Sequence, residues 1–432
     1  MGDQYNSFQI GVLVFFACVL LFAVAVFAGW IPIGRSADTE FMGSVTVWGP
    51  WPSSQVSELI HVINSQNDNL VKINYVGKTG SKLEQDYVRE RIQGRGPDLI
   101  IINDTWLGRY RDTFWILPYS SFSERDFRTT YADGFDIFLT EEGSLARPLL
   151  VDPLVMFYNR DIYNQSGVAG PPATWVELID GPAGAESVLK RLNIIEDRLT
   201  VKQSAVAMGQ YSNITNAKDV VVSLLLQVGD RLVTGSTNRE ADSRGRAALE
   251  FYSRFANTNR FEYSWNRTLP NDKQMFLSGN LANYFGFASE LDSLRRGNPN
   301  LNMDVHFFPQ NSSATIKATA GRFYAVAVNL NSVNPQAAFK AAGILASDRY
   351  SNLWEEAIGL PSAGRSRLGQ GHSNPFMSVF YRSALLARTW LDPDPHTTNG
   401  VFQNMIETVA AGGQSAEAAL ETARRQISNL FD

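Results

Sequence analysis

The chain begins with a long apolar stretch that is unlike anything after it. Residues 10–33, from Ile10 to Ile33, contain no charged side chain. A membrane-spanning helix needs about 20 apolar residues, whereas the apolar part of a secretory signal needs only about 7 to 15. The pattern therefore predicts a short tail over residues 1–9 and a transmembrane anchor, or an uncleaved signal, over residues 10–33.

Two alternatives to an anchor remain open. Small residues at Ala23-Val24-Ala25 and Val26-Phe27-Ala28 resemble signal-peptidase sites, which would make the stretch a long cleavable signal. Lipid attachment at Cys18 is disfavoured because Phe15 and Phe16 come before it and Val19-Leu20 follow it. Only Arg35 follows the stretch closely, so the distribution of positive charge does not decide the orientation.

From residue 44 onward, short β-rich runs alternate with segments of helical periodicity. Val56, Leu59, Ile60 and Ile63 recur at helical spacing after a serine that can cap the helix. Such alternation is typical of an α/β protein with a parallel sheet that has helices on both faces. The pattern predicts strands over 45–48, 71–76 and 98–102, and helices from 53 onward and over 83–92.

The rest of the chain continues with both kinds of segment and has no internal repeat, low-complexity tract or long linker. Helices are predicted over 217–228, 244–256, 335–346, 378–390, 400–410 and 416–430, and strands over 281–286, 303–308 and 323–329.

Two loops at the carboxyl ends of predicted strands carry indole rings beside small polar groups. In a parallel sheet, ligands bind at these ends of the strands. Indole rings with hydrogen-bonding neighbours are typical of a site that stacks on apolar faces and holds hydroxyl groups. The alternative is that each ring packs under its loop as a core residue. The candidate binding residues are Trp48, Trp51 and Ser53 in the first loop, and Asn103, Asp104, Thr105 and Trp106 in the second.

One carboxylate, Asp152, interrupts an almost continuous apolar run over residues 149–159. A charge inside a buried strand needs a partner or a function. It is therefore a further candidate.

Composition and charge exclude several classes of function. The net charge is -5, so no broad basic surface is available to neutralise nucleic-acid phosphates. The only cysteine lies in the apolar stretch, so the globular body has no disulfides and no thiolate chemistry. No nucleophile elbow, phosphate loop or cofactor motif is present, and the four histidines are not spaced as metal ligands. The sequence therefore predicts a protein that is not an enzyme.

Several motifs in the body resemble one known family. The most specific part is the stretch from Phe157-Tyr158-Asn159-Arg160-Asp161 through Gly167 to Pro171-Pro172-Ala173-Thr174-Trp175. Supporting matches are Gly96-Pro97-Asp98, Phe276-Leu277-Ser278-Gly279-Asn280, Gly321-Arg322-Phe323-Tyr324 and Gly412-Gly413-Gln414-Ser415. Their order and spacing are similar to those of the family 1 extracellular solute-binding proteins of ABC importers.

The resemblance implies a two-lobed periplasmic-binding-protein-like fold of type II, with hinge crossings between the lobes. The first lobe would comprise residues 44–150 and 326–360, and the second residues 153–324 and 361–432. The implied protein is a monomer on the extracytoplasmic side of the cell membrane, which captures a small solute and delivers it to an ABC permease. The solute that the resemblance implies is a sugar. The alternatives are a non-sugar solute, or a tethered receptor or scaffold with the same fold.

The resemblance also assigns ligand contacts to Trp51 and Ser53, to residues 103–106 and to Asp152. Two alternatives remain: Asp104 could cap a helix, and Asp152 could form a salt bridge that steadies the hinge. The family's second-lobe aromatic platform is replaced here by Phe287-Ala288-Ser289-Glu290. Tyr284, Phe287 and Tyr324 are the candidates to supply a ring instead, and the alternative is that each of them is a core residue.

Overall fold

The computed structural model describes residues 12, 14–16, 19–20, 41–67, 70–180, 186–197, 200–230, 239–314 and 316–431. The predicted apolar anchor over 10–33 lies mostly outside these residues. In the described part of the chain, no helix has both the length and the apolarity that a membrane span requires.

The amino-terminal lobe is built on three parallel strands. β1 (Ser44–Gly49) lies between β2 (Lys72–Gly77) and β3 (Leu99–Ile102). The buried residues of α2 (Ser53–Gln66) are Val56, Leu59, Ile60 and Ile63, the same four that the sequence pattern selected. The predicted alternation of strand and helix is therefore confirmed here. Further helices of this lobe are α3 (Lys82–Ile92), α4 (Leu107–Tyr110), α5 (Glu124–Thr130), α13 (Pro335–Leu345) and α14 (Ser351–Ile358).

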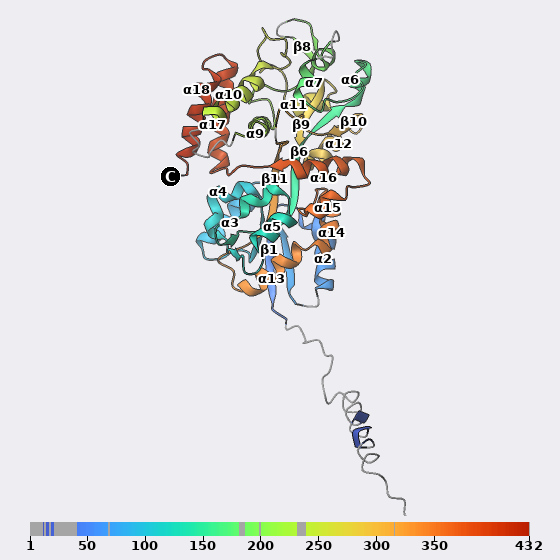
Figure 1. Cartoon of the computed structure of the whole chain (residues 1–432), viewed down its shortest axis with the longest axis vertical. Coiled ribbons are helices and arrows are strands. Elements are labelled where there is room, and N and C mark those ends of the chain that lie inside the picture. The colour runs from blue at the N-terminus through green and yellow to red at the C-terminus, as the bar shows by residue number, and fades with distance from the viewer. Residues whose placement is uncertain are drawn as a thin grey trace, which may run out of the picture.

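Two long strands connect the lobes and join their sheets into one. β6 (Arg147–Asn159) and β11 (Thr319–Val328) are antiparallel to each other; β11 also pairs with β3, and β6 with β9 (Leu281–Phe287). The resulting order is β2-β1-β3-β11-β6-β9, followed by β8 (Val201–Val206) and β7 (Ile194–Ile195). The predicted parallel arrangement is confirmed for β1, β2 and β3, but the connecting strands add antiparallel pairs, because they run in opposite directions between the lobes. Figure 1 shows β6 and β11 between the first lobe at the bottom and the second at the top.

The second lobe surrounds the other half of β6. Its strands are β7 (Ile194–Ile195), β8 (Val201–Val206), β9 and β10 (Met303–His306). Its helices are α6 (Arg160–Gln165), α7 (Trp175–Ile179), α8 (Val188–Leu192), α9 (Ala217–Gln227), α10 (Arg239–Arg254), α11 (Asp272–Leu277), α12 (Leu291–Gly297), α17 (Pro395–Ala410) and α18 (Ala416–Ser428). In Figure 1, α17 and α18 flank this lobe beside α10.

A third connection between the lobes follows α14. The short helix α15 (Arg365–Gly369) packs on the first lobe, where Leu368 is buried and the backbone N–H of Ala363 donates to the carbonyl of Leu149. α16 (Pro375–Leu386) packs against β6 and lies across the boundary in Figure 1. The structure therefore places residues 361–369 with the first lobe, although the sequence analysis assigned them to the second.

Within the third connection, α16 ends earlier than the sequence predicted. The helix predicted over 378–390 ends at Leu386, because Ala387 and Arg388 form the short strand β12 alongside Thr319 and Ala320. The next residues, 389–394, run without regular structure to the first turn of α17. This correction places Trp390 between the lobes, outside any helix.

Short elements complete the described fold. They are the 3-10 helices η1 (Asp104–Trp106), η2 (Arg111–Thr113), η3 (Asp133–Phe138), η4 (Ala288–Glu290) and η5 (Asp348–Tyr350), and the small antiparallel sheet of β4 (Leu117–Pro118) and β5 (Gly143–Ser144).

Candidate functional site

A polar cavity of about 290 Å³ lies between the two lobes. Asp104 and Thr105 line it from η1 of the first lobe, and the amino-terminal turn of α9 lines it from the second. β11, the loop before α9, the third connection and the start of α17 supply the remaining walls. The other polar and aromatic residues of the lining are Tyr211, Thr215, Asn216, Lys218, Asp219, Arg322, Arg388, Thr389, Trp390, Asp392 and Asn399.

Arg322 on β11 is the central cation of this cavity. It lies directly across from Asp152 in the β6–β11 ladder, and its guanidinium carbon is 3.7 Å from the centroid of the Phe287 ring. No residue in the described part of the chain hydrogen-bonds to this guanidinium or forms an ion pair with it. Burial acts to lower the pKa of Arg322, but the carboxylates of Asp219 and Asp152 outweigh burial and raise it. Arg322 therefore stays charged, with N–H donors free for a ligand.

Two side chains at the start of α9 bring opposite charges to the cavity. Lys218 Nζ donates to Asp392 Oδ2 at 2.6 Å and to Thr398 Oγ1 at 2.8 Å, and it lies 5.6 Å from the centroid of the Trp390 ring. Asp219 is half-buried, and burial raises its pKa while Arg322 and Lys218 oppose the rise. Lys218 is thus held by the protein, whereas the carboxylate of Asp219 is an acceptor beside the free donors of Arg322.

Asp104 joins η1 to both connecting segments. Its Oδ1 accepts from the backbone N–H of Phe323 at 2.8 Å, and its Oδ2 accepts from the hydroxyl of Thr389 at 2.5 Å. Burial raises the pKa of Asp104 to about 6, and these two hydrogen bonds limit the rise. Asn103 occupies the N-cap position of η1, so the alternative in which Asp104 caps a helix is wrong. Each carboxylate oxygen has a second lone pair with which it can accept from a ligand.

The rest of the predicted second loop faces away from the cavity. Trp106 is only 8% exposed, and its ring packs against Tyr87 and Tyr110 with centroids 5.6 and 5.1 Å away. Asn103 accepts a hydrogen bond from the Thr105 hydroxyl at 2.6 Å. Of this loop, only Asp104 and Thr105 line the cavity. The packing of Trp106 agrees with the alternative in which the ring is a core residue.

The first predicted loop also lies outside the cavity lining. Trp51 packs between Tyr324 and Trp354, with ring centroids 5.2 and 5.8 Å away. Ser53 Oγ accepts from the backbone N–H of Gly77 at 2.8 Å. Lys78 Nζ lies 4.1 Å from the centroid of the Trp48 ring. The contact of these residues with a ligand stays a prediction.

Of the three rings proposed for the second-lobe platform, two are fully buried. Tyr284 donates its hydroxyl hydrogen to Glu290 Oε2 at 2.7 Å and stacks on Phe276, and Phe287 lies beneath Arg322. Tyr324 is half-buried against Trp51. None of the three lines the cavity; the half-buried rings that do are those of Tyr211 and Trp390.

Asp152 is completely buried beneath the cavity wall. Its Oδ1 accepts from the backbone N–H of Ser289 at 2.9 Å, and its Oδ2 has no hydrogen-bond partner among the described residues. Burial raises its pKa to about 6, while the charge of Arg322 opposes the rise. Arg322 and Asp152 do not form a direct ion pair, so the predicted hinge salt bridge is present only as a longer-range attraction.

Of the residues that line the cavity, the sequence indicated only Asp104 and Thr105 as ligand contacts. Those that it did not indicate include Lys218, Asp219, Arg322 and Trp390. For Arg322 a signal was present, because it is the only charge in the strand from Thr319 to Val328, just as Asp152 is in its own run. Lys218, Asp219 and Trp390 carry no such signal, because only the folded chain brings α9 and the third connection to the same cavity.

The fold and the cavity define a two-lobed binding protein with a polar cavity between its lobes. A family model of bacterial extracellular solute-binding proteins matches residues 58–365, and the chain belongs to this family. The family and the solute-binding function predicted from the sequence are thereby confirmed. In the described residues, no group of three side chains is arranged to hold a metal ion.

Solved structures of such proteins share the fold. The sugar-binding protein MalE from Xanthomonas citri is 18% identical with a TM-score of 0.70, over 90% of this chain and 97% of that one. A cyclo/maltodextrin-binding protein complexed with maltotetraose is 15% identical with a TM-score of 0.68, over 89% and 96%. An ABC transporter solute-binding protein from Thermotoga lettingae, bound with α-D-tagatose, is 17% identical with a TM-score of 0.65, over 90% and 100%.

Proposed function

We propose that the protein captures a carbohydrate in the cavity between the lobes and delivers it to the permease of an ABC importer. The observation that carries the proposal is that the free donors of Arg322 and the acceptor Asp219 line the same cavity, together with the rings of Trp390 and Tyr211. A sugar ring presents hydroxyl groups at its edge and apolar C–H groups on its faces, so it matches both features. The sugar complexes of structural relatives support the proposal.

The proposed ligand contacts come from both lobes and from the connections between them. Asp104 and Thr105 belong to the first lobe, Asp219 to the second, and Arg322 and Trp390 to the connecting segments. A sugar can contact all of them only while the lobes are close together. Because a ligand shifts a conformational equilibrium by its differential affinity, sugar binding would favour the closed arrangement.

A thermal-shift screen over monosaccharides, oligosaccharides, polyols and amino acids tests this function. A ligand that binds only the folded state raises the melting temperature, and the rise grows with ligand concentration. We expect a concentration-dependent rise with at least one sugar. A rise with amino acids alone would instead assign a non-sugar solute, and the carbohydrate proposal would be abandoned.

Arg322→Met should weaken binding of the sugar found in that screen by at least about tenfold. The substitution keeps an unbranched side chain but removes all the donors, and a hydrogen bond to a charged group contributes about 1.5–3 kcal/mol. Arg322→Lys, which keeps the charge without the planar fork, should lose less. Calorimetric titration measures the affinities, and Arg160→Met, at an exposed arginine of α6, is the matched control. Equal affinities of Arg322→Met and the control would remove Arg322 from the site.

We also propose that residues 10–33 remain attached and anchor the body to the outer face of the membrane. The length of the uncharged stretch supports this proposal. Intact-mass measurement of protein extracted from membranes should give the full-length mass. A mature amino terminus near Gly29 or Trp30 would show that the stretch is a cleaved signal.

A further inference from the structure

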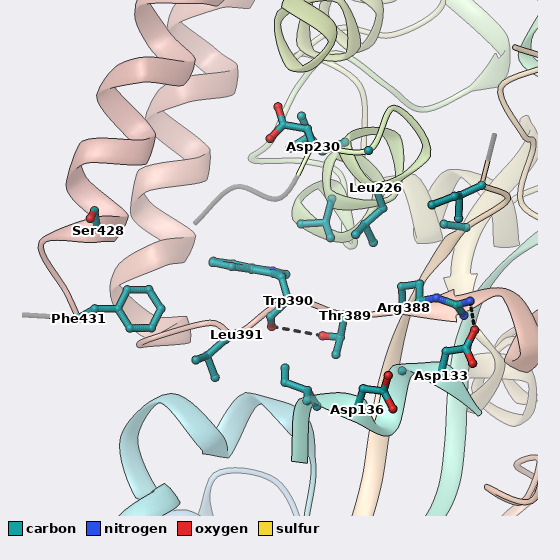
Figure 2. A pocket seen from close by; sticks show the side chains of 17 residues that line it. Asp133, Asp136, Leu226, Asp230, Arg388, Thr389, Trp390, Leu391, Ser428 and Phe431 are labelled. Carbon is teal, nitrogen blue, oxygen red and sulfur yellow. Dashed lines mark hydrogen bonds and ion pairs between the residues drawn. The ribbon is translucent and has the colours of Figure 1, made fainter. Parts of the chain in front are cut away.

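A second and larger cavity adjoins the first. Its volume is about 940 Å³, and it shares Val222, Arg388, Thr389 and Trp390 with the smaller one. The first lobe lines it through η3, and the second lobe through α9, the last residue of α18 and Phe431 near the carboxyl terminus. The third connection passes between these walls. Figure 2 shows Asp133 and Asp136 below the open space, and Leu226 and Asp230 above it.

Every charged side chain of this lining is already paired. Asp133 bonds to both Arg365 and Arg388, Asp136 bonds to Arg128, and Asp230 Oδ2 lies 2.5 Å from Arg424. The smaller cavity is different, since it contains the unoccupied donors of Arg322. A charged ligand in the larger cavity would have to compete with these existing ion pairs.

The surfaces between the ion pairs are apolar. Val222, Leu225 and Leu226 form one face of α9, and in Figure 2 the Trp390 ring lies below Leu226. In Figure 2, Leu391 and the ring of Phe431 border the same space. Hydroxyl groups of a bound sugar would find few partners on such walls, and polar groups buried without partners cost free energy.

We propose that this cavity is a second ligand site, which takes an uncharged, mainly aromatic or apolar small molecule. Its volume lies within the range of about 300–1,000 Å³ that is typical of small-molecule sites. The paired charges exclude an ionic ligand, and the Trp390 ring offers a stacking surface. Because both lobes line the cavity, the site is complete only while both are in place. The proposal does not depend on the identity of the solute in the smaller cavity.

The uncharged fluorophore N-phenyl-1-naphthylamine is a suitable probe of this site. The full chain is labelled with 5-fluorotryptophan, and the Trp390 resonance is assigned from its loss in Trp390→Phe. We expect the probe to shift this resonance saturably, with a Kd below about 0.1 mM. Because the readout is local to Trp390, probe that partitions into detergent or the amino-terminal segment does not contribute. The absence of a saturable shift would overturn the site.

Two cavity-filling variants test whether both lobes form the site. Leu226→Trp in α9 and Ile137→Trp in η3 each place a large ring in the cavity, so each should weaken probe binding at least tenfold. Leu330→Trp, at an exposed leucine outside the cavity, is the matched control. Melting curves establish which variants fold, and either filling variant alone suffices. Probe binding as tight as in the control would overturn the proposal.

A charged analogue of the probe tests the proposed ligand class. 1-Anilinonaphthalene-8-sulfonate has the same aromatic skeleton with one added sulfonate. It should shift the Trp390 resonance at least tenfold more weakly than the uncharged probe does. Equal affinities would show that the site does not select uncharged molecules, and this part of the proposal would be wrong.

Discussion

Trp106→Ala is expected to lower the free energy of unfolding by about 3–5 kcal/mol, the usual cost of truncating a large buried aromatic side chain. The indole ring is almost fully buried among Tyr87, Tyr110 and the other apolar residues of the first-lobe core. Its loss would leave a cavity that the surrounding sheet and helices cannot close. Affinity for the solute, measured on protein that remains folded, should change little because Trp106 does not line the binding cavity.

Urea denaturation followed by circular dichroism measures this effect. Trp115→Ala is the matched control, because Trp115 is in the same lobe and 40% exposed; we expect it to cost about 1 kcal/mol or less. Near-normal stability of Trp106→Ala together with lost solute binding would contradict the core assignment. Such a result would restore the role predicted from the sequence, in which the ring stacks on the ligand.

Asp152→Ala is expected to destabilise the protein by about 2–4 kcal/mol. The substitution leaves the backbone N–H of Ser289 without its acceptor and removes a negative charge that faces Arg322. The affinity for solute should change little, because Asp152 is fully buried and does not line the cavity. Unliganded melting and calorimetric titration of the variant separate the two effects. A large loss of affinity with normal stability would instead make Asp152 a ligand contact.

The raised pKa of Asp152 gives this residue a characteristic pH dependence. Its pKa is 3.8 in an unperturbed setting and about 6 in the fold. The folded state therefore binds the proton more tightly, and the stability from this residue is complete below pH 4 and is lost as the pH rises through 6. The isosteric Asp152→Asn does not titrate. Between pH 5 and pH 7.5, the wild type should lose roughly 1–2 kcal/mol relative to this variant.

Denaturation curves of both proteins at the two pH values test the sign of this effect. Asp180→Asn, which replaces an exposed aspartate that follows α7, is a control for general effects of pH. A wild type that gains stability relative to Asp152→Asn as the pH rises would show that Asp152 forms a close ion pair in solution.

The sequence predicted some residues of the cavity lining but not others. It identified the loop that contains Asp104 and Thr105, because that loop follows a buried strand at the edge where ligands bind. The sequence could not show that Trp106 packs in the core, since a tryptophan at this position fits the sequence pattern equally well as a core residue and as a ligand contact. It found Asp152 as an unusual buried charge but could not show that Arg322 lies opposite it on β11.

The third connection shows the same limit. The helix predicted over residues 378–390 is present up to Leu386, where pairing of Ala387 and Arg388 with β11 ends it. That pairing partner is far away in the sequence, and local propensity contains no information about it. The position of Trp390 between the two cavities follows directly from this early helix end.

By itself, the sequence determined the α/β class, the family, and many of the helices and strands close to their observed bounds. These properties depend on local periodicity, motif order and composition, which are all carried along the chain. Only the tertiary structure decided the composition of the two cavities, because their walls come from η1, η3, α9, β11 and the third connection. The tertiary structure also decided which charges are paired. Asp133 lies beside Arg365 and Arg388, whereas Arg322 keeps free donors, and both arrangements depend on how β6 and β11 join the lobes.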